Sequence, residues 1–567
     1  MATQQGCSIL SGLGAGLGVC GRPRRFRITD FLDAQVDRSD GLERLRLVFD
    51  TGAGEEEMIL EPIPTKCTTI SVWWEALQLW PMQYRSAMTE KPAGAGSSFS
   101  RLKMVLVDLF RPNLIVEHFR NVDKLGFSQN IIRANTARVS NLDESSVGSR
   151  VLPANFLYDG ERIDLEAWLK RHWTTGLVVL KVDPNDMTKA KLVHERYWRG
   201  NHKHSQCVSW SQCKSIMSAL IGIAVEKKLI DTIDDPVTKY AEKLEGSGFD
   251  GVPIKHVLEM RSGIKFDENY MNPFADLYRL GASMARGHPM DDLVSGLKRN
   301  DKIAKAFGVG KSQCVSGKYR NYISVNTQAL VMVLKGALRK SQDQEFKDGE
   351  KAMSVSKFAE HYLWSKAGFG DDAIWLLDNA EQQTELGFGI FGATTRDYAR
   401  LGWLYLNGGK SPATGEQVVP KEWVETSITC PEDPQMKPGL NLAADTHFFG
   451  YGYQWWLGPK FDDDGSKEAF QKFRTQPNGR FGDSGEYESI PGVGDCAGDY
   501  AAIGVYGQMI YVSPDRGVVI AKNAADPYYD SYAQTVRPPP GVSQKGFPEG
   551  WSFENLLENQ GFMASGP

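Results

Sequence analysis

The chain has 567 residues, of which 41% are hydrophobic and 24% are charged, and its formal net charge is −5. This length permits up to about four domains at ~150 residues each, and the mildly acidic balance excludes a globally basic nucleic-acid binder. The longest strongly apolar run, residues 216–225, is about half of the ~20 residues that a membrane span needs. We therefore expect a globular protein.

The first 112 residues carry no pattern that assigns a chemistry. Residues 1–29 contain no Asp or Glu but several Arg, which fits an organelle transit peptide as well as an N-terminal extension. Residues 52–58 are acidic and turn-like, and residues 92–100 form a linker rich in Pro, Gly and Ser. We predict that residues 1–112 are a partly disordered extension of unknown function. We expect a cytoplasmic protein, with organelle targeting as the alternative.

Strand signals gather at the two ends of the following region. Residues 176–183 and 191–198 predict a hairpin, and residues 500–512 and 517–523 predict a second strand pair. Residues 451–457 predict one more strand. Helical sequence lies between these ends, at 211–228, 252–260, 326–339, 355–364, 395–407 and 420–426. This order predicts an α+β fold, in which one sheet joins the two ends and helices cover it and form a lobe.

Ser211 and Lys214 open the most apolar of these helices. Residues three apart share a helix face, and both burial and the helix N-terminus disfavour a protonated lysine there. The amine can then activate the serine to attack an ester or amide carbonyl and form an acyl-enzyme. The alternative is a helix N-cap beside a solvent-facing lysine. The same spacing recurs elsewhere, at Ser100–Lys103, Ser262–Lys265, Ser295–Lys298 and Ser354–Lys357.

Residues 211–231 (SQCKSIMSALIGIAVEKKLID) resemble the nucleophile helix of serine β-lactamases and penicillin-binding proteins. They are most similar to the branch of class C β-lactamase-like esterases and 6-aminohexanoate-dimer hydrolases. Further blocks follow in the family's order, at 257–270, 317–334, 387–409, 418–427, 451–457 and 504–514. The resemblance implies a β-lactamase/transpeptidase-like domain over residues 113–538, with an antiparallel sheet flanked by helices. The helical lobe would lie mostly within 230–430, and residues 539–567 would be a C-terminal tail.

The family's second motif, Tyr-x-Asn or Tyr-x-Ser, corresponds to Tyr322-Ile-Ser324. The resemblance implies that Tyr322 shares proton transfer with Lys214 and that Ser324 contacts the substrate. Whether Lys214 or Tyr322 is the immediate base stays open at this point. Taken alone, Tyr322 would be a core aromatic at a helix entry.

The family's third motif, usually Lys-Thr-Gly or His-x-Gly, corresponds to Ala502-Ile-Gly504 and lacks its cation. This loss disfavours a carboxylate-bearing substrate such as a penicillin. The similar branch keeps Gly-x-x-Gly-Gln, present here from Gly504 to Gln508. The resemblance implies an oxyanion hole made by the backbone N–H groups of Ser211 and Val505, with Gly504 and Tyr506 against the substrate. The glycines could also mark a twisted edge strand.

Two further sets of residues were considered as binding groups. Tyr270 matches a tyrosine that contacts the substrate amide in the nylon-oligomer branch, whereas Gly281 stands near the place of an acidic residue in some members. His202, His204 and Cys207 could suggest a metal, but they show no obvious fourth ligand, so we expect solvated loop residues there. We predict Tyr270 as a substrate contact.

These observations predict a serine hydrolase of the carboxylesterase or amidase type. It would cleave a small ester or amide through a Ser211 acyl-enzyme and need neither a metal nor an organic cofactor. We expect no nucleic-acid partner, and a homo-oligomer is compatible with the sequence. The enzymatic alternative is a D-amino-acid peptidase or a β-lactamase. The alternative of another class is a catalytically idle scaffold or ligand-binding member of the fold.

Overall fold

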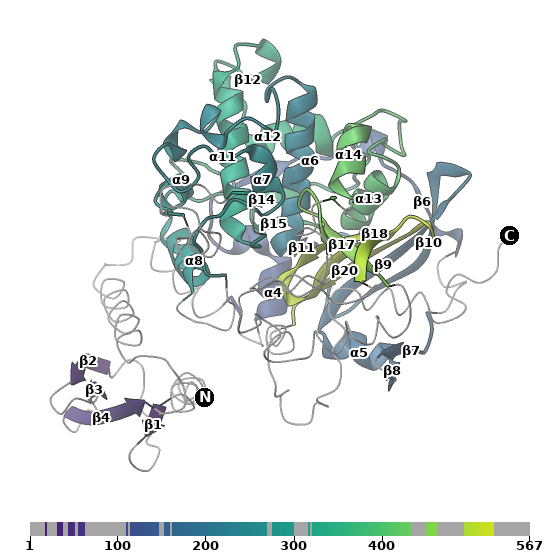
Figure 1. The fold of residues 1–567 in the computed structure, drawn as a ribbon. Helices are drawn as coiled ribbons and strands as arrows, with labels where there is room; N and C mark the ends of the chain where they lie inside the picture. The colour runs from purple at the N-terminus through teal and green to yellow at the C-terminus, as the bar shows by residue number, and fades with distance from the viewer. Residues whose placement is uncertain are drawn as a thin grey trace. The chain divides into compact units, whose positions relative to one another are not determined.

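The computed structural model divides into two compact units, residues 1–99 and residues 100–567 (Figure 1). The residues it describes are 17–19, 31–37, 44–50, 55–62, 109–110, 114–146, 152–158, 161–268, 275–299, 316–317, 320–429, 431–432, 450–461 and 493–526. The predicted substrate contact Tyr270 lies outside these ranges.

The first unit contains a four-stranded antiparallel sheet in the order β1-β4-β3-β2. Its strands are β1 (Leu17–Val19), β2 (Phe31–Asp37), β3 (Arg44–Asp50) and β4 (Glu55–Pro62). The prediction of a turn over residues 52–58 is therefore wrong from Glu55 onward. The acidic run of β4 pairs with β3 (RLRLVFD), with Glu57 opposite Val48, and strand pairing outweighs the poor intrinsic β-propensity of glutamate.

The large sheet of the second unit has eight strands in the order β16-β17-β18-β19-β20-β9-β10-β6. Strand β20 (Val518–Ala524) pairs antiparallel with β9 (Thr174–Asp183), so that Val519 lies opposite Leu180. This pairing confirms the prediction that one sheet joins the two ends of the domain. Strand β10 (Asp186–Tyr197) completes the first hairpin, and its other edge carries a short parallel pairing with β6 (Leu142–Asp143).

The prediction of a single strand over residues 500–512 is wrong. That segment contains the end of β18 (Val493–Gly504), a tight turn at Val505–Gly507 and β19 (Gln508–Ser513). The turn is not evident in the sequence, because no polar residue marks it. The chain reverses there by adopting positive φ angles at Tyr506 (63°) and Gly507 (87°). Residues 451–457 likewise divide between β16 (Gly450–Tyr451) and β17 (Trp456–Phe461).

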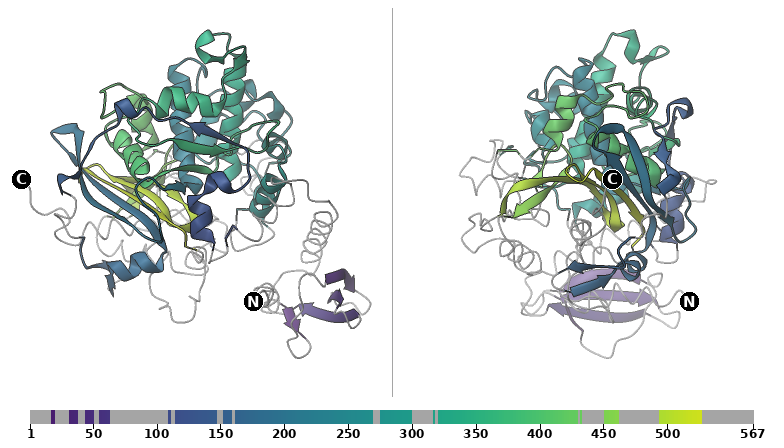
Figure 2. Two further views of the ribbon diagram at one scale, coloured as in Figure 1. Left: turned by 180° about the vertical axis from the view of Figure 1, so that it is seen from behind. Right: turned by 90° about the vertical axis from the view of Figure 1, so that its right-hand side faces the viewer.

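The six predicted helical segments all contain helix in the structure. The lobe helices are α6 (Cys213–Glu226), α7 (Ile254–Leu258), α8 (Asp276–Arg286), α9 (Met290–Ser295), α11 (Ser324–Lys340) and α12 (Val355–Ala359), which continues as a π-turn over Glu360–Trp364. Helix α14 (Lys421–Ser427) packs on α6. Helix α13 (Thr395–Leu406) packs on one face of the large sheet and α5 (Leu165–Arg171) lies on the other, as Figures 1 and 2 show.

Smaller sheets and helices complete the second unit. A four-stranded sheet, in the order β11-β15-β14-β5, consists of β11 (Gln206–Val208), β15 (Phe391–Thr394), β14 (Ala373–Leu376) and β5 (Gln129–Ile132). The remaining described elements are α4 (Ile115–Arg120), β7 (Asn155–Tyr158), β8 (Glu161–Asp164), β12 (Lys347–Asp348) and β13 (Lys351–Ala352), besides short 3-10 turns. In the described part of the chain, no helix is long and apolar enough to cross a membrane.

Candidate active site

Ser211 stands where the small sheet meets helix α6. After β11 the chain forms a 3-10 turn at Trp210–Gln212, which delays the start of α6 to Cys213. The Ser209 N–H donates to the Phe391 carbonyl (2.7 Å) and so ties the turn to β15. Trp210 has a φ of 44°, a conformation that non-glycine residues rarely adopt unless the surroundings fix it. The Ser211 side chain is thereby presented at the beginning of a buried helix.

Lys214 lies beneath Ser211 and is 1% exposed. Its Nζ donates to Ser211 Oγ (2.8 Å), to the Phe388 carbonyl (2.7 Å) and to Ser324 Oγ (3.3 Å). Burial lowers the pKa of Lys214 to about 8, although the Glu268 carboxylate acts in the opposite direction. A lysine with this pKa is neutral in part near physiological pH, so it can accept a proton from Ser211.

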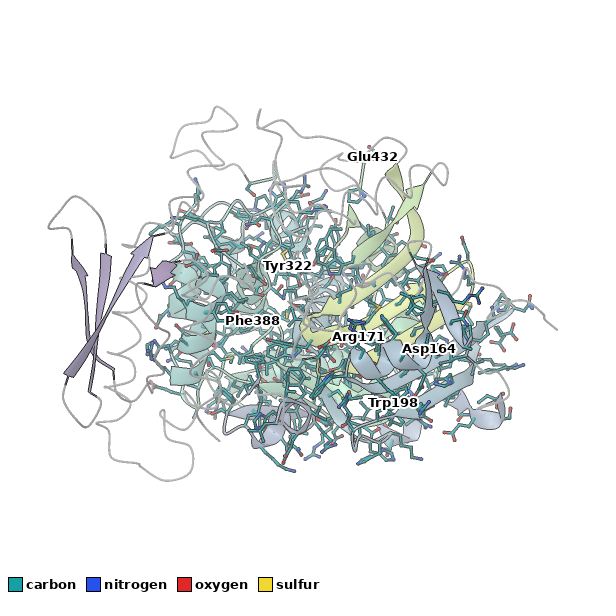
Figure 3. All side chains as sticks on the ribbon, turned by 90° about the horizontal axis from the view of Figure 1, so that it is seen from below. Asp164, Arg171, Trp198, Tyr322, Phe388 and Glu432 are labelled. Carbon is teal, nitrogen blue, oxygen red and sulfur yellow. The ribbon has the colours of Figure 1, made fainter. Side chains whose placement is uncertain are left out.

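Tyr322 faces the same pair from the segment that leads into α11. The centroid of its ring lies 5.1 Å from Lys214 Nζ. The ring also stacks on that of Trp456, with 5.0 Å between the two centroids. Burial and the Glu268 carboxylate raise the pKa of Tyr322, while hydrogen bonding with Ser211 acts against them. The phenol is therefore protonated at neutral pH and available as a proton donor. In Figure 3, Tyr322 and Phe388 lie where the teal helical elements meet the yellow strands of the sheet.

Glu268 is a charged member of this cluster that the sequence interpretation missed. Its carboxylate accepts hydrogen bonds from the Ser324 Oγ (2.6 Å) and from the Ser324 backbone N–H. It therefore caps the N-terminus of α11, where a negative charge is favourable. The hydrogen bonds run continuously from Ser211 through Lys214 and Ser324 to Glu268. No local spacing announces this contact, although Glu268 belongs to the block 257–270 that carried part of the resemblance.

Gly504, which precedes the predicted oxyanion donor Val505, lies against the turn that carries Ser211. It is the last residue of β18. A Cβ placed on Gly504 would lie 2.4 Å from the Ser209 carbonyl oxygen and 3.1 Å from the Ser211 nitrogen. Only glycine permits this approach. The end of β18, just before Val505, thus lies beside the turn at Trp210–Gln212, as two N–H groups that share one oxyanion would require.

Four aromatic rings pack together beside these donors. They belong to Phe110, Phe119, Trp210 and Tyr506. Trp210 immediately precedes Ser211 and Tyr506 immediately follows Val505, and the two ring centroids are 5.4 Å apart. Both residues have positive φ angles, so the ring contact helps to fix two strained positions.

The expectation of solvated loop residues at His202, His204 and Cys207 is wrong for Cys207, which lies in strand β11 and is buried. Nothing approaches within 4 Å of a Cβ placed on Gly281. His204 Nδ1 lies 2.9 Å from an Asp371 oxygen, and Cys207 is 4% exposed. Among the described residues, no group of three or more His, Cys, Asp or Glu side chains could hold a metal ion.

Comparisons with known proteins identify the family of this chain. A sequence model of the Beta-lactamase family matches residues 185–537. The chain belongs to the Beta-lactamase family. A 6-aminohexanoate-dimer hydrolase from Paenarthrobacter ureafaciens is 25% identical over 407 residues, which cover 70% of this chain and 83% of that protein. The family and this relative support a hydrolase.

A solved structure has the same fold. It comes from Bacillus anthracis and is described as a candidate 6-aminohexanoate-dimer hydrolase. Its TM-score is 0.53 at 16% identity, and the match covers 77% of this chain and 93% of that one. This likeness confirms the predicted β-lactamase/transpeptidase-like α+β fold.

Proposed function

We propose that this protein is a serine hydrolase that cleaves a small ester or amide through an acyl-enzyme on Ser211. The observation that carries the proposal is the contact of 2.8 Å between Lys214 Nζ and Ser211 Oγ, made by a lysine whose pKa burial lowers to about 8. A neutral amine in hydrogen-bond contact with a hydroxyl is the arrangement that a general base needs.

The reaction would proceed in two stages. As Ser211 Oγ attacks the carbonyl carbon, its proton passes to Lys214, and the N–H groups of Ser211 and Val505 stabilise the oxyanion. Tyr322 then gives a proton to the leaving amine or alcohol and is reprotonated from Lys214. In the second stage, water attacks the acyl-enzyme, the same groups take its proton, and Ser211 regains its hydrogen. The raised pKa of Tyr322 favours Lys214 as the immediate base.

The choice of substrate follows from the charges around the nucleophile. Ala502 stands where relatives carry a cation, and Glu268 adds a carboxylate near Lys214. These features disfavour substrates that are recognised through their own carboxylate, such as penicillins. The relative from Paenarthrobacter, named a hydrolase of the 6-aminohexanoate dimer, supports amide hydrolysis.

The test uses the full-length protein, a fluorescent fluorophosphonate, short-chain esters and amides, and a fluorescent penicillin. We expect wild-type labelling and turnover, and a loss on the order of 10⁴-fold or more for Ser211→Ala. The matched control is Ser427→Ala, because Ser427 is likewise a buried serine but donates to the Trp423 carbonyl in helix α14. Turnover that survives Ser211→Ala contradicts the proposal. Labelling without turnover of any ester, amide or β-lactam favours a binding role instead.

A further inference from the structure

The turn that carries Val505 is held by side chains of strands β19 and β20. Tyr506 and Gly507 both have positive φ angles, and such a conformation persists only where its surroundings determine it. The turn joins Gly504 and Gln508, which are partners in the β18–β19 pairing. Its three carbonyl groups accept hydrogen bonds from the β19–β20 side of the sheet.

Gln508 supplies the first of these supports. Its side chain is 1% exposed, and its Nε2 donates to the carbonyls of Val505 (3.4 Å) and Tyr506 (3.3 Å) in the turn. The same nitrogen donates to the Ala524 carbonyl on β20 (2.5 Å). The Gln508 amide oxygen accepts from Asn523 Nδ2 (3.0 Å). One amide group therefore fastens the turn to the neighbouring strand.

Lys522 supplies the second support. This lysine of β20 is 5% exposed, and its Nζ donates to the Gly507 carbonyl (3.0 Å). The ammonium group also lies 5.5 Å from the centre of the Trp168 ring. Burial lowers the pKa of Lys522 to about 8 while the Asp526 carboxylate acts against this. A buried cation is costly unless it is well paired, and here a carbonyl of the turn pairs with it.

A carbonyl that is held fixes the peptide group to which it belongs, because C=O and N–H lie in one plane and point in opposite directions. The bonds to Val505, Tyr506 and Gly507 thus fix three consecutive peptide groups. The Val505 N–H belongs to the peptide group just before these three. Gly504, on the other side of that peptide, lies against the turn at Trp210–Gln212. The position of the predicted oxyanion donor therefore depends on the turn staying in place.

We propose that Lys522 and Gln508 are positioning residues of the oxyanion hole: they hold the Val505–Gly507 turn from behind so that the Val505 N–H stays directed at the acyl oxygen. This inference rests on the proposed function. Neither side chain transfers a proton or contacts the substrate. Their loss should slow the formation of the tetrahedral species without weakening the initial binding of the reagent.

The same sheet provides a matched control. Lys181 of β9 donates from its Nζ to the Arg516 carbonyl. Arg516 lies in the turn that joins β19 to β20, at the opposite end of β19 from the Val505–Gly507 turn. Lys181→Met and Lys522→Met each remove one lysine–carbonyl bond from a hairpin turn. Only Lys522→Met affects the turn beside Ser211.

The experiment measures how fast a fluorophosphonate labels the full-length protein as its concentration is raised. We expect Lys522→Met to lower the limiting rate roughly 10- to 100-fold, somewhat less than deletion of an oxyanion donor, with an unchanged half-saturating concentration. Gln508→Met should behave in the same way, and Lys181→Met should change the rate less than about twofold. The pH at which the rate is half-maximal should not move in any variant. Thermal melts establish that each variant is folded.

Three results would overturn the inference. The first is labelling at the wild-type rate by folded Lys522→Met and Gln508→Met variants. The second is a Lys181→Met variant whose labelling is slowed as much as that of the other two variants. Failure of both variants to fold would assign the two side chains to stability of the sheet. A wild-type protein that the reagent does not label at Ser211 is a different result, because it removes the proposed function itself and this inference with it.

Discussion

Ser211 lies between two regions of the molecule. The helical lobe contributes charged and hydroxyl side chains, those of Lys214, Ser324 and Glu268. The sheet contributes backbone, at Gly504 and Val505. In the proposed mechanism, the first side works through proton affinity, which burial and a neighbouring carboxylate adjust. The second works through position, which a turn with two positive φ angles maintains. Substitutions on the lobe side should therefore alter how the rate depends on pH. Substitutions on the sheet side should alter only its size.

The sharpest way to separate the two sides is Lys214→Met, which keeps an unbranched apolar side chain in the buried position. The wild-type acylation rate should rise with pH through about 8, because the amine whose pKa is lowered to about 8 must lose its proton to act as a base. The variant should lose roughly 10²- to 10⁴-fold in rate and lose this rise. Ester turnover measured from about pH 6 to about pH 10 checks it. A variant that keeps the same rising limb contradicts the role of Lys214.

Tyr322→Phe should have the next largest effect. The ring stacking on Trp456 survives the change, so the thermal midpoint should hardly move. Amide hydrolysis should fall about 10²-fold, because an amine leaves poorly without a proton. A p-nitrophenyl ester should be affected much less, since its leaving group departs as an anion. Tyr240→Phe is the control, because the Tyr240 hydroxyl donates to Asp235 in a surface loop. Equal losses for amide and ester would contradict a donor role.

Glu268→Gln should give the smallest effect, seen mainly as a shift in pH. The substitution keeps an oxygen that can accept from the Ser324 N–H but removes the charge that raises the pKa of Lys214. The rising limb should therefore move to lower pH by roughly 0.5–1 unit, which corresponds to about 1 kcal/mol. The rate on the plateau should fall by less than about tenfold. A limb that moves to higher pH would show that the carboxylate does not act on Lys214 in this way.

The residues of the two sides also differ in how far they could be predicted from the sequence. Ser211 and Lys214 were predictable because three-residue spacing on an apolar helix fixes their proximity, and Tyr322 and Ser324 followed from the order of the resembling blocks. Glu268 and the Phe388 carbonyl reach Lys214 from distant segments, so no spacing announces them.

The supports of the sheet side were hidden for a different reason. The run from residue 500 to 512 is apolar except for Gln508 and two glycines, and the turn within it is set by backbone angles rather than by polarity. Lys522 looks like an ordinary strand residue in the sequence. The sheet formed by β1 to β4 was missed as well, because its acidic strand lacks the alternation that predicts a strand.

The pairing of β9 with β20 has a consequence for how the molecule is made. Lys181 and Arg516, which meet through a hydrogen bond, are 335 residues apart in the chain. A contact over such a distance forms late and slowly, because the long intervening segment must be closed into a loop first. On the ribosome, Ser211 and Lys214 emerge long before the strands that complete their surroundings. The nascent chain would thus carry its reactive pair without an oxyanion hole, and hydrolytic activity should appear only after β20 has been synthesised and has docked.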